Sequence, residues 1–185
     1  WYRCRVTPFP GRGRPRAIVV HEDVTPLLQE EHARALTLDV LQRIHDASDL
    51  PDLMAGVTGL LKERLGLDAI GIRLRNQDDF PYYETRGFSP EFVRAESRLC
   101  VYDDDGKLVR DAGGNPVLDC MCGIVIRGGV RPGLPFFTPY GSFWTNSTSS
   151  LLASTTEQDR QARTRNRCNG EGYESVALIP LRSAG

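Results

Sequence analysis

The sequence predicts an α+β fold in which an antiparallel sheet is flanked by helices. Helical and extended patterns follow one another in the second part of the chain, in the order helix, two strands, helix, strands, helix, strand. Turn signals such as Asp105-Gly106 and Gly113-Gly114-Asn115 separate short extended pieces, as in antiparallel hairpins. Hydrophobic residues make up 40% of the 185 residues, which is enough to build a core.

The chain begins with a predicted hairpin and a long helix. Residues 1–9 and 17–23 read as two strands, and the basic connection at 11–16 as a solvated turn. Thr25 is expected to cap a helix over 24–47, with Pro26 at its first position. That helix carries an apolar stripe, which fits either a dimeric coiled coil or a helix lying on its own domain. The stripe consists of Leu28, Ala35, Leu38, Leu41 and Ile44.

The next predicted elements are a helix, a hairpin and a short helix. The helix begins at Ser48, and its apolar residues recur on one side. The alternating segment 69–76 predicts a strand, and 80–88 predicts its hairpin partner. Ser89 is expected to cap the short helix that follows.

The last third contains extended pieces around one more predicted helix. Residues 100–120 read as short extended segments with turns, and the aromatic stretch 135–147 as a buried strand with irregular flanks. Residues 154–167 predict a helix that opens with a capping box between Ser154 and Glu157. A strongly apolar strand is expected near the end, within 168–182.

Composition limits the kinds of partner and location. The formal net charge of −1 provides no global field to attract nucleic acid or an anionic membrane. The longest apolar runs are far too short to span a bilayer, and the opening residues lack the apolar region of a signal peptide. Five cysteines without an export signal indicate a cytoplasmic protein whose thiols stay reduced or bind metal.

Several motifs resemble those of sensory domains. The segment from Asp49 to Arg182, with KERLGLDAIGIRLR at 62–75 and GYESVALIPLR at 172–182, resembles a GAF domain. The opening WYRCRVTPF and AIVVHEDVT resemble the last two strands of a PAS domain and its exit into a connecting helix. The combination of CMCG, GSFWTNST and NRCNGEGYES resembles a subfamily of PAS/GAF sensor histidine kinases.

The resemblance implies a domain plan and a role. Residues 1–23 would be the end of a PAS-like domain, 24–47 a signalling helix, and 48–185 a GAF-like sensor domain truncated at its C-terminus. The implied role is regulatory signal transduction in a two-component system, with a homodimer formed through the linker helix. The chain has neither a phospho-acceptor helix nor glycine-rich nucleotide boxes, so it is not expected to be an enzyme itself, although the parent protein would be a histidine kinase.

Four cysteines form the strongest candidate site. If 118–126 is extended, Cys120 and Cys122 point to one side of the strand, roughly 6–7 Å apart. A hairpin path would return Cys100 to this pair, and Cys168 would arrive just before the last strand. Four thiolates suit zinc or an iron–sulfur cluster.

Other interpretations of these cysteines stay open. They are simple buried packing, a thiol–disulfide switch for redox sensing, and haem, which some sensor-kinase GAF domains that resemble this one bind through cysteine. Cys4 is expected to serve packing only. Two alternative functions also remain. One is a thiol-dependent methionine sulfoxide reductase like those of some free-standing GAF proteins, and the other is a dimerisation module without a ligand.

A ligand pocket is expected near the cysteines. The resemblance places Tyr140, Phe143 and Trp144 where GAF domains line their cavity, and Asn169 and Glu171 on a turn that would cap it. Ordinary core packing is the competing interpretation of the aromatic residues. Three arginines are expected on one face of the predicted helix over 154–167, where they would meet solvent or an anion: Arg160, Arg163 and Arg167.

Overall fold

The computed structural model describes residues 1–10, 16–129, 131, 133–161 and 163–182. It divides into two compact units, Trp1–Asp68 and Ala69–Gly185. Helices and antiparallel strand pairs occur in both, so the predicted α+β class is confirmed. Most of the predicted basic connection, residues 11–15, lies outside the described residues. Because the second unit begins after Asp68, the helix that starts near Ser48 groups with the first unit.

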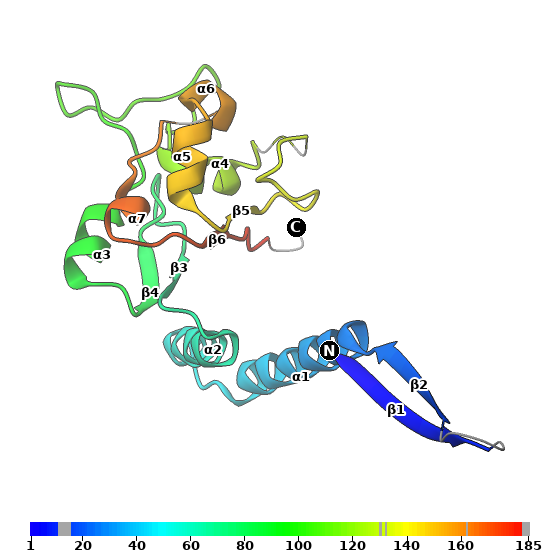
Figure 1. Cartoon of the computed structure of the whole chain (residues 1–185). Coiled ribbons are helices and arrows are strands. Elements are labelled where there is room, and N and C mark those ends of the chain that lie inside the picture. Colours follow the sequence, from blue (N-terminus) through cyan, green and yellow to red (C-terminus); the bar gives the residue numbers. More distant parts are fainter. Residues whose placement is uncertain (11–15, 130, 132, 162, 183–185) are drawn as a thin grey trace. The chain divides into compact units, whose positions relative to one another are not determined.

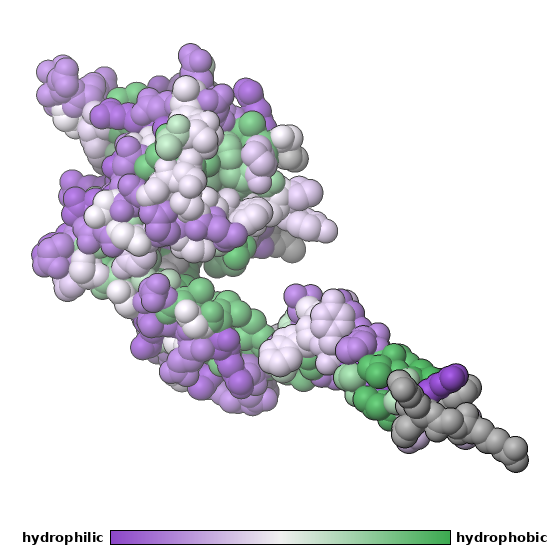
Figure 2. Space-filling view, in the orientation of Figure 1, coloured by the Kyte–Doolittle hydropathy of each residue, from purple (hydrophilic) through white to green (hydrophobic). Residues whose placement is uncertain are grey.

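The first unit opens with the predicted hairpin. Strands β1 (Tyr2–Phe9) and β2 (Arg16–Asp23) pair antiparallel, with Tyr2 opposite Asp23 (Figure 1). Every residue of β2 is exposed. The hairpin therefore presents hydrophobic side chains to solvent on its surface (Figure 2), among them Val6, Ile18, Val19 and Val20.

Two helices complete the first unit. Helix α1 (Thr25–Asp46) forms within the predicted range, but its N-cap is Val24, which makes no side-chain capping bond, and not Thr25 as predicted. None of its residues is buried, so its apolar stripe stays accessible within the unit. Helix α2 (Leu50–Leu65) is capped by Asp49, whose side chain accepts a hydrogen bond from the Asp52 amide. It ends at Gly66, which has the left-handed φ of 62° that glycine adopts without strain.

The second unit begins with a hairpin and a capped helix, both as predicted. Strands β3 (Ile70–Arg73) and β4 (Tyr82–Arg86) pair antiparallel. Ser89 accepts a hydrogen bond from the Phe92 amide and starts helix α3 (Pro90–Glu96). Phe92 is 1% exposed and stacks on Phe88, with ring centroids 4.7 Å apart, which fixes α3 in the unit.

Asp79 ties the β3–β4 connection to the segment after α3. Its Oδ1 accepts hydrogen bonds from the amides of Phe80 (2.8 Å), Leu99 (2.9 Å) and Cys100 (3.2 Å). The chain then makes an excursion and returns, with antiparallel bridges between Cys100 and Leu118 and between Arg110 and Pro116. The predicted hairpin-like path of residues 100–120 is thereby confirmed.

The remainder consists of short helices and one strand pair. Helix α4 (Cys120–Arg127) precedes strand β5 (Phe143–Thr145), which pairs antiparallel with the last strand, β6 (Val176–Leu178). Helices α5 (Thr148–Ser154), α6 (Glu157–Arg160) and α7 (Arg167–Gly170) lie between these strands in the sequence. Leu151 of α5 packs against the cluster that contains Met121 and Val125 of α4, so these two helices are neighbours in this unit (Figure 1).

The predicted helix over 154–167 is wrong. The capping box forms between Thr156 and Asp159, and α6 ends after Arg160 because Gln161 adopts a left-handed φ of 60°. The strands of the described residues form three two-stranded sheets, β1–β2, β3–β4 and β5–β6, and no larger sheet. The GAF-like topology therefore stays a prediction.

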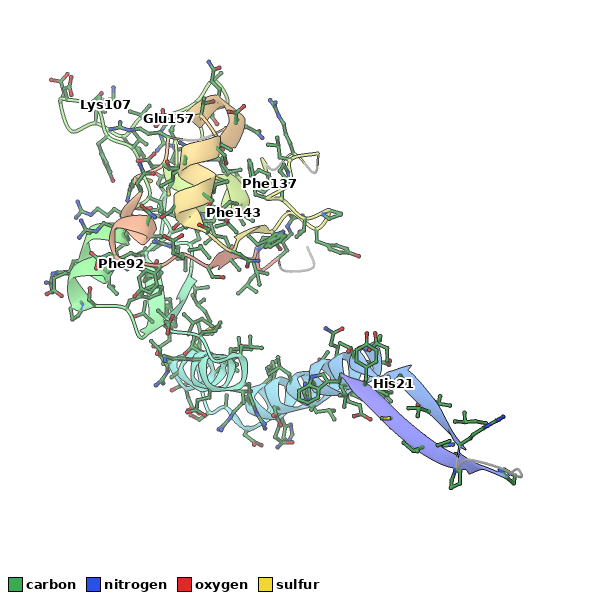
Figure 3. All side chains as sticks on the ribbon, viewed as in Figure 1. His21, Phe92, Lys107, Phe137, Phe143 and Glu157 are labelled. Atoms are coloured by element: carbon green, nitrogen blue, oxygen red, sulfur yellow. The ribbon has the colours of Figure 1, made fainter. Side chains whose placement is uncertain are left out.

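Two small clusters form the core of the second unit. One brings aromatic and aliphatic residues together around α4 and β5, where Figure 3 labels Phe137 and Phe143. Its buried members are Met121, Val125, Phe136, Phe137 and Phe143. The other consists of Leu99, Cys100 and Leu118, with Cys122 packed against it. Helix α4 lies between them, because Met121 and Val125 enter one cluster and Cys122 contacts the other.

Among the described segments, no helix has the length and apolar character needed to cross a membrane.

Candidate functional site

The Cys-Met-Cys segment forms the first turn of helix α4. Asp119 is the N-cap, and its Oδ1 accepts a hydrogen bond from the Cys120 amide at 3.0 Å. Cys120 has a φ of 64°, which is uncommon for a residue other than glycine. The expectation of an extended backbone at this position is wrong. A short apolar run suits a buried helix as well as a buried strand, so periodicity cannot separate them.

Three of the four predicted cysteines nevertheless share one cavity. Cys120 and Cys122 from α4, and Cys168 from α7, line a cavity of about 70 Å³. The amide of Cys120 also donates to the carbonyl of Arg163 at 3.1 Å, which joins the α4 segment to the stretch before Cys168. The returning chain thus adds Cys168 to this cavity, on helix α7 rather than beside a strand.

Burial controls the ionisation of two of these thiols. Burial, together with negative charge on Cys120, raises the pKa of Cys122 to about 12, and Arg73 opposes the rise. Burial likewise raises the pKa of Cys168 to about 11, with contributions from Cys120 and Glu96. Both thiols are therefore protonated at neutral pH in the metal-free protein.

Cys100 occupies a different environment. It is 5% exposed and packs in the cluster with Leu99 and Leu118. Its Sγ donates to the carbonyl of Asp78 at 3.2 Å, and burial, with the nearby Asp79 carboxylate, raises its pKa to about 11. Of the described cysteines, those that line the cavity are Cys120, Cys122 and Cys168. Exposed Cys4 lies in the first unit.

Buried charges surround the thiols. Glu96 is 6% exposed and lines the cavity; burial raises its pKa, and Arg165 and Arg73 oppose the rise. Arg165 lies 3.7 Å from Glu96 and 3.1 Å from Asp119. Burial disfavours the charge of Arg165, but the hydrogen bond and charge of Asp119, with Glu96, outweigh it and raise the arginine pKa. Arg165 thus pairs with the Asp119 carboxylate at the start of α4.

Arg73 is the second arginine whose charge acts on Glu96. Its guanidinium donates to the carbonyls of Glu96 (2.6 Å) and Phe80 (2.9 Å) and lies 3.7 Å from the centre of the Tyr82 ring. Burial raises the Tyr82 pKa to about 12, with Arg73 opposing the rise. Arg73 is therefore fixed by its contacts in a position where its charge acts on Cys122 and Cys168.

The predicted pocket residues divide into two groups. Phe143, which is 3% exposed, and Asn169 line the cavity. Trp144 is 44% exposed, and Glu171 forms a 3.6 Å ion pair with Arg167; in the described structure neither lines the cavity. Tyr140 is 87% exposed, so it does not serve as a wall. Successive residues of a strand point to opposite faces, which explains why Phe143 and Trp144 differ.

Arg160 is the residue that sequence reasoning misjudged. It is 6% exposed and lines the cavity; Arg167 also lines the cavity but is exposed, as is Arg163. The common helical face expected for these arginines does not form, because α6 ends at Arg160. The early capping box at Thr156 and Asp159 is the sequence signal that marks this short helix.

The donor chemistry of the cavity suits a soft metal. Three cysteines line one cavity, and thiolates are ligands of zinc and of iron–sulfur clusters. The described residues contain no group of three His, Cys, Asp or Glu side chains arranged as metal ligands. Histidine is absent from the sequence after His45, so a haem ligand in the second unit would have to be another residue.

Comparisons with known proteins return no relative. Neither protein-family models, curated proteins nor solved structures match this chain.

Proposed function

We propose that the chain is part of a sensory protein and that its second unit reads a signal at Cys120, Cys122 and Cys168. The observation that supports this proposal is that three cysteines from two distant segments line one cavity. Simple packing does not require three thiols to line the same cavity. The resemblance to PAS and GAF domains of sensor histidine kinases supports the regulatory role.

The proposed signal chemistry is a metal–thiolate or redox change. When bound, zinc would give a structural site, whereas an iron–sulfur cluster would make the site responsive to oxygen or redox state. Three protein thiolates leave one position of a tetrahedral site open, which a small ligand or another donor would complete. Because Cys122 and Cys168 hold their protons to high pH, binding a metal must release them.

Signal output is proposed to involve helix α1. A change at the thiol site alters function only if it stabilises one conformation of the protein over another. The accessible apolar stripe of α1 supports a homodimer formed through this helix, with residues such as Leu38 (61% exposed) and Leu41 (54% exposed) at the contact. A cytoplasmic location of this signalling protein is part of the same proposal.

The reductase alternative receives less support from the site. Reduction of methionine sulfoxide by cysteine needs a nucleophilic thiolate and a resolving thiol. Cys122 and Cys168 have raised pKa values, which is opposite to thiolate activation. A dimerisation module without a ligand would leave the cysteine-lined cavity without a role.

The decisive experiment is metal analysis combined with an absorption spectrum of anaerobically purified protein. We expect zinc, or iron with sulfide-to-iron charge-transfer bands, bound in the wild type and lost in the Cys122→Ser and Cys168→Ser variants. Cys4→Ser, which changes an exposed thiol of the first unit, is the matched control and should keep the metal. Wild-type protein without zinc or iron would contradict a metal site, and turnover of free methionine sulfoxide would favour the reductase alternative.

A further inference from the structure

Arg160 carries a buried positive charge that the described protein groups satisfy only in part. Its Nη1 donates to the carbonyl of Thr155 at 2.6 Å and to the Thr155 hydroxyl at 2.7 Å. Its Nε is buried and has no hydrogen-bond partner among the described residues. No carboxylate of the described residues forms an ion pair with it within 4.0 Å, although Asp159 is close enough to sense its charge.

A buried arginine without an anion is costly. Moving a guanidinium out of water is compensated only when its N–H groups are hydrogen-bonded and its charge is paired. Glu96 lines the same cavity but is engaged by Arg165 at 3.7 Å. The unused donor and the unpaired charge of Arg160 therefore call for an anionic group supplied from outside the chain.

The rest of the cavity wall is mostly apolar. Met121, Phe143, Leu151, Leu152, Val176 and Leu178 contribute to it. The cavity volume of about 70 Å³ is several times the roughly 10–15 Å³ that one water molecule requires. An inorganic anion would satisfy Arg160 but would leave these apolar side chains facing water, whereas an anion with a short apolar body would cover both.

We propose that the cavity binds a small organic acid, whose carboxylate pairs with Arg160 and whose short apolar body packs against Leu152 and Phe143. Carboxylate and guanidinium match in geometry as well as charge, which favours a carboxylate at this position. This inference rests on the proposed function because it concerns the same thiol-lined cavity. An organic acid, as well as a metal, would occupy that cavity.

Thermal unfolding and calorimetry of the whole chain test the proposal with butyrate as the probe. Butyramide, which has a similar shape but no charge, is the matched control ligand, and inorganic phosphate tests for an anion without an apolar body. We expect butyrate to bind and to raise the melting temperature of the wild type. Arg160→Gln should weaken butyrate binding about tenfold or more. Arg163→Gln, which changes an exposed arginine nearby, should leave it unchanged.

A second variant keeps the test decisive if Arg160→Gln does not fold. Leu152→Phe fills part of the cavity and keeps the arginine, so butyrate binding should fall in this variant while it remains folded. Equal binding of butyramide and butyrate, binding of phosphate alone, or full butyrate binding by either variant would overturn the proposal. So would an absence of butyrate binding to the wild type.

Metal content measured in every preparation separates this proposal from the proposed function. Butyrate binding by a wild type that contains no metal would support the acid site and contradict the metal site. A metal-loaded wild type that binds no butyrate would support the metal site and contradict the acid site.

Discussion

The guanidinium of Arg165 lies 3.1 Å from the carboxylate of Asp119, which caps the helix that starts at Cys120. The two side chains are only 23% and 18% exposed, so solvent screens their interaction less than that of a surface pair. Because Arg165 lies three residues before Cys168, this ion pair holds together the two segments that supply the cavity thiols. The thiol site thus depends on a contact outside its own wall.

Asp119→Asn tests this dependence. The amide oxygen can still accept the hydrogen bond from the Cys120 amide, but the charge that pairs with Arg165 is lost. We expect the free energy of unfolding to fall by about 2 kcal/mol in a urea titration. Glu91→Gln, which removes the partner of the exposed Arg94, should change it by at most about 0.5 kcal/mol. Equal effects of the two variants would contradict a special role of the Arg165 pair.

Gly123→Ala should disturb the start of α4. A methyl group at this position would lie 2.7 Å from the Leu118 carbonyl oxygen, which belongs to the backbone and cannot rotate away. We expect a loss of about 1–3 kcal/mol in stability, with reduced metal retention because Cys122 is adjacent. Gly129→Ala is the control, since its nearest neighbours would be 3.9 Å away. A fully stable Gly123→Ala variant would show that α4 is less tightly held than these contacts indicate.

Stability of the metal-free protein should decline at alkaline pH. Burial raises the pKa of Cys122 to about 12 and those of Cys100 and Cys168 to about 11, above the value of about 9 expected in the unfolded chain. Between these values the folded state binds more protons than the unfolded state, so the free energy of unfolding decreases as pH rises. Urea titrations from pH 8 to pH 11 measure the slope.

The matched comparison for this slope is between two variants. Cys168→Ala removes one raised pKa and should flatten the decline, whereas Cys4→Ser, at an exposed thiol, should leave the slope as it is in the wild type. A wild type whose stability is constant over this range would contradict the protonated, buried state of the thiols.

Dimerisation through α1 is tested by charge placed in its apolar stripe. Leu38 and Leu41 are 61% and 54% exposed in the single chain, so Leu38→Glu and Leu41→Glu should not disrupt its own core. We expect the double variant to shift the sedimentation equilibrium towards monomer, because buried unpaired carboxylates oppose association. Glu31→Gln, on the same helix, is the control. A monomeric wild type would exclude the proposed contact.

Local signals in the sequence predicted much of the fold. Ser89 was expected to cap α3, and its bond to the Phe92 amide spans only three residues, so the pattern contains the information. The β1–β2 and β3–β4 hairpins likewise join neighbouring segments. The conformation of 118–126 was mispredicted because an apolar run is compatible with either element until tertiary packing decides.

The site was predictable only in part, because tertiary packing also decides which side chains reach the cavity. Cys168 reaches the cavity near Cys120 and Cys122, as the returning chain suggested, while Cys100 turns to the Asp78 carbonyl, which no spacing rule indicates. Arg160 had the sequence features of a solvated arginine. Arg160 is buried because of where α6 ends and because of the space that α4 and α5 leave between them. Contacts between residues that are distant in the sequence determine both the helix end and this space.

The three amides that converge on Asp79 bear on how this unit comes apart. If the segment at Leu99 separates from the β3–β4 connection, the amides of Leu99 and Cys100 both lose their shared acceptor, so opening this contact costs free energy. Deuterium should consequently enter positions 99 and 100 in one concerted event. In evolutionary terms, position 79 would accept few replacements, because one side-chain oxygen there must reach two separate stretches of chain.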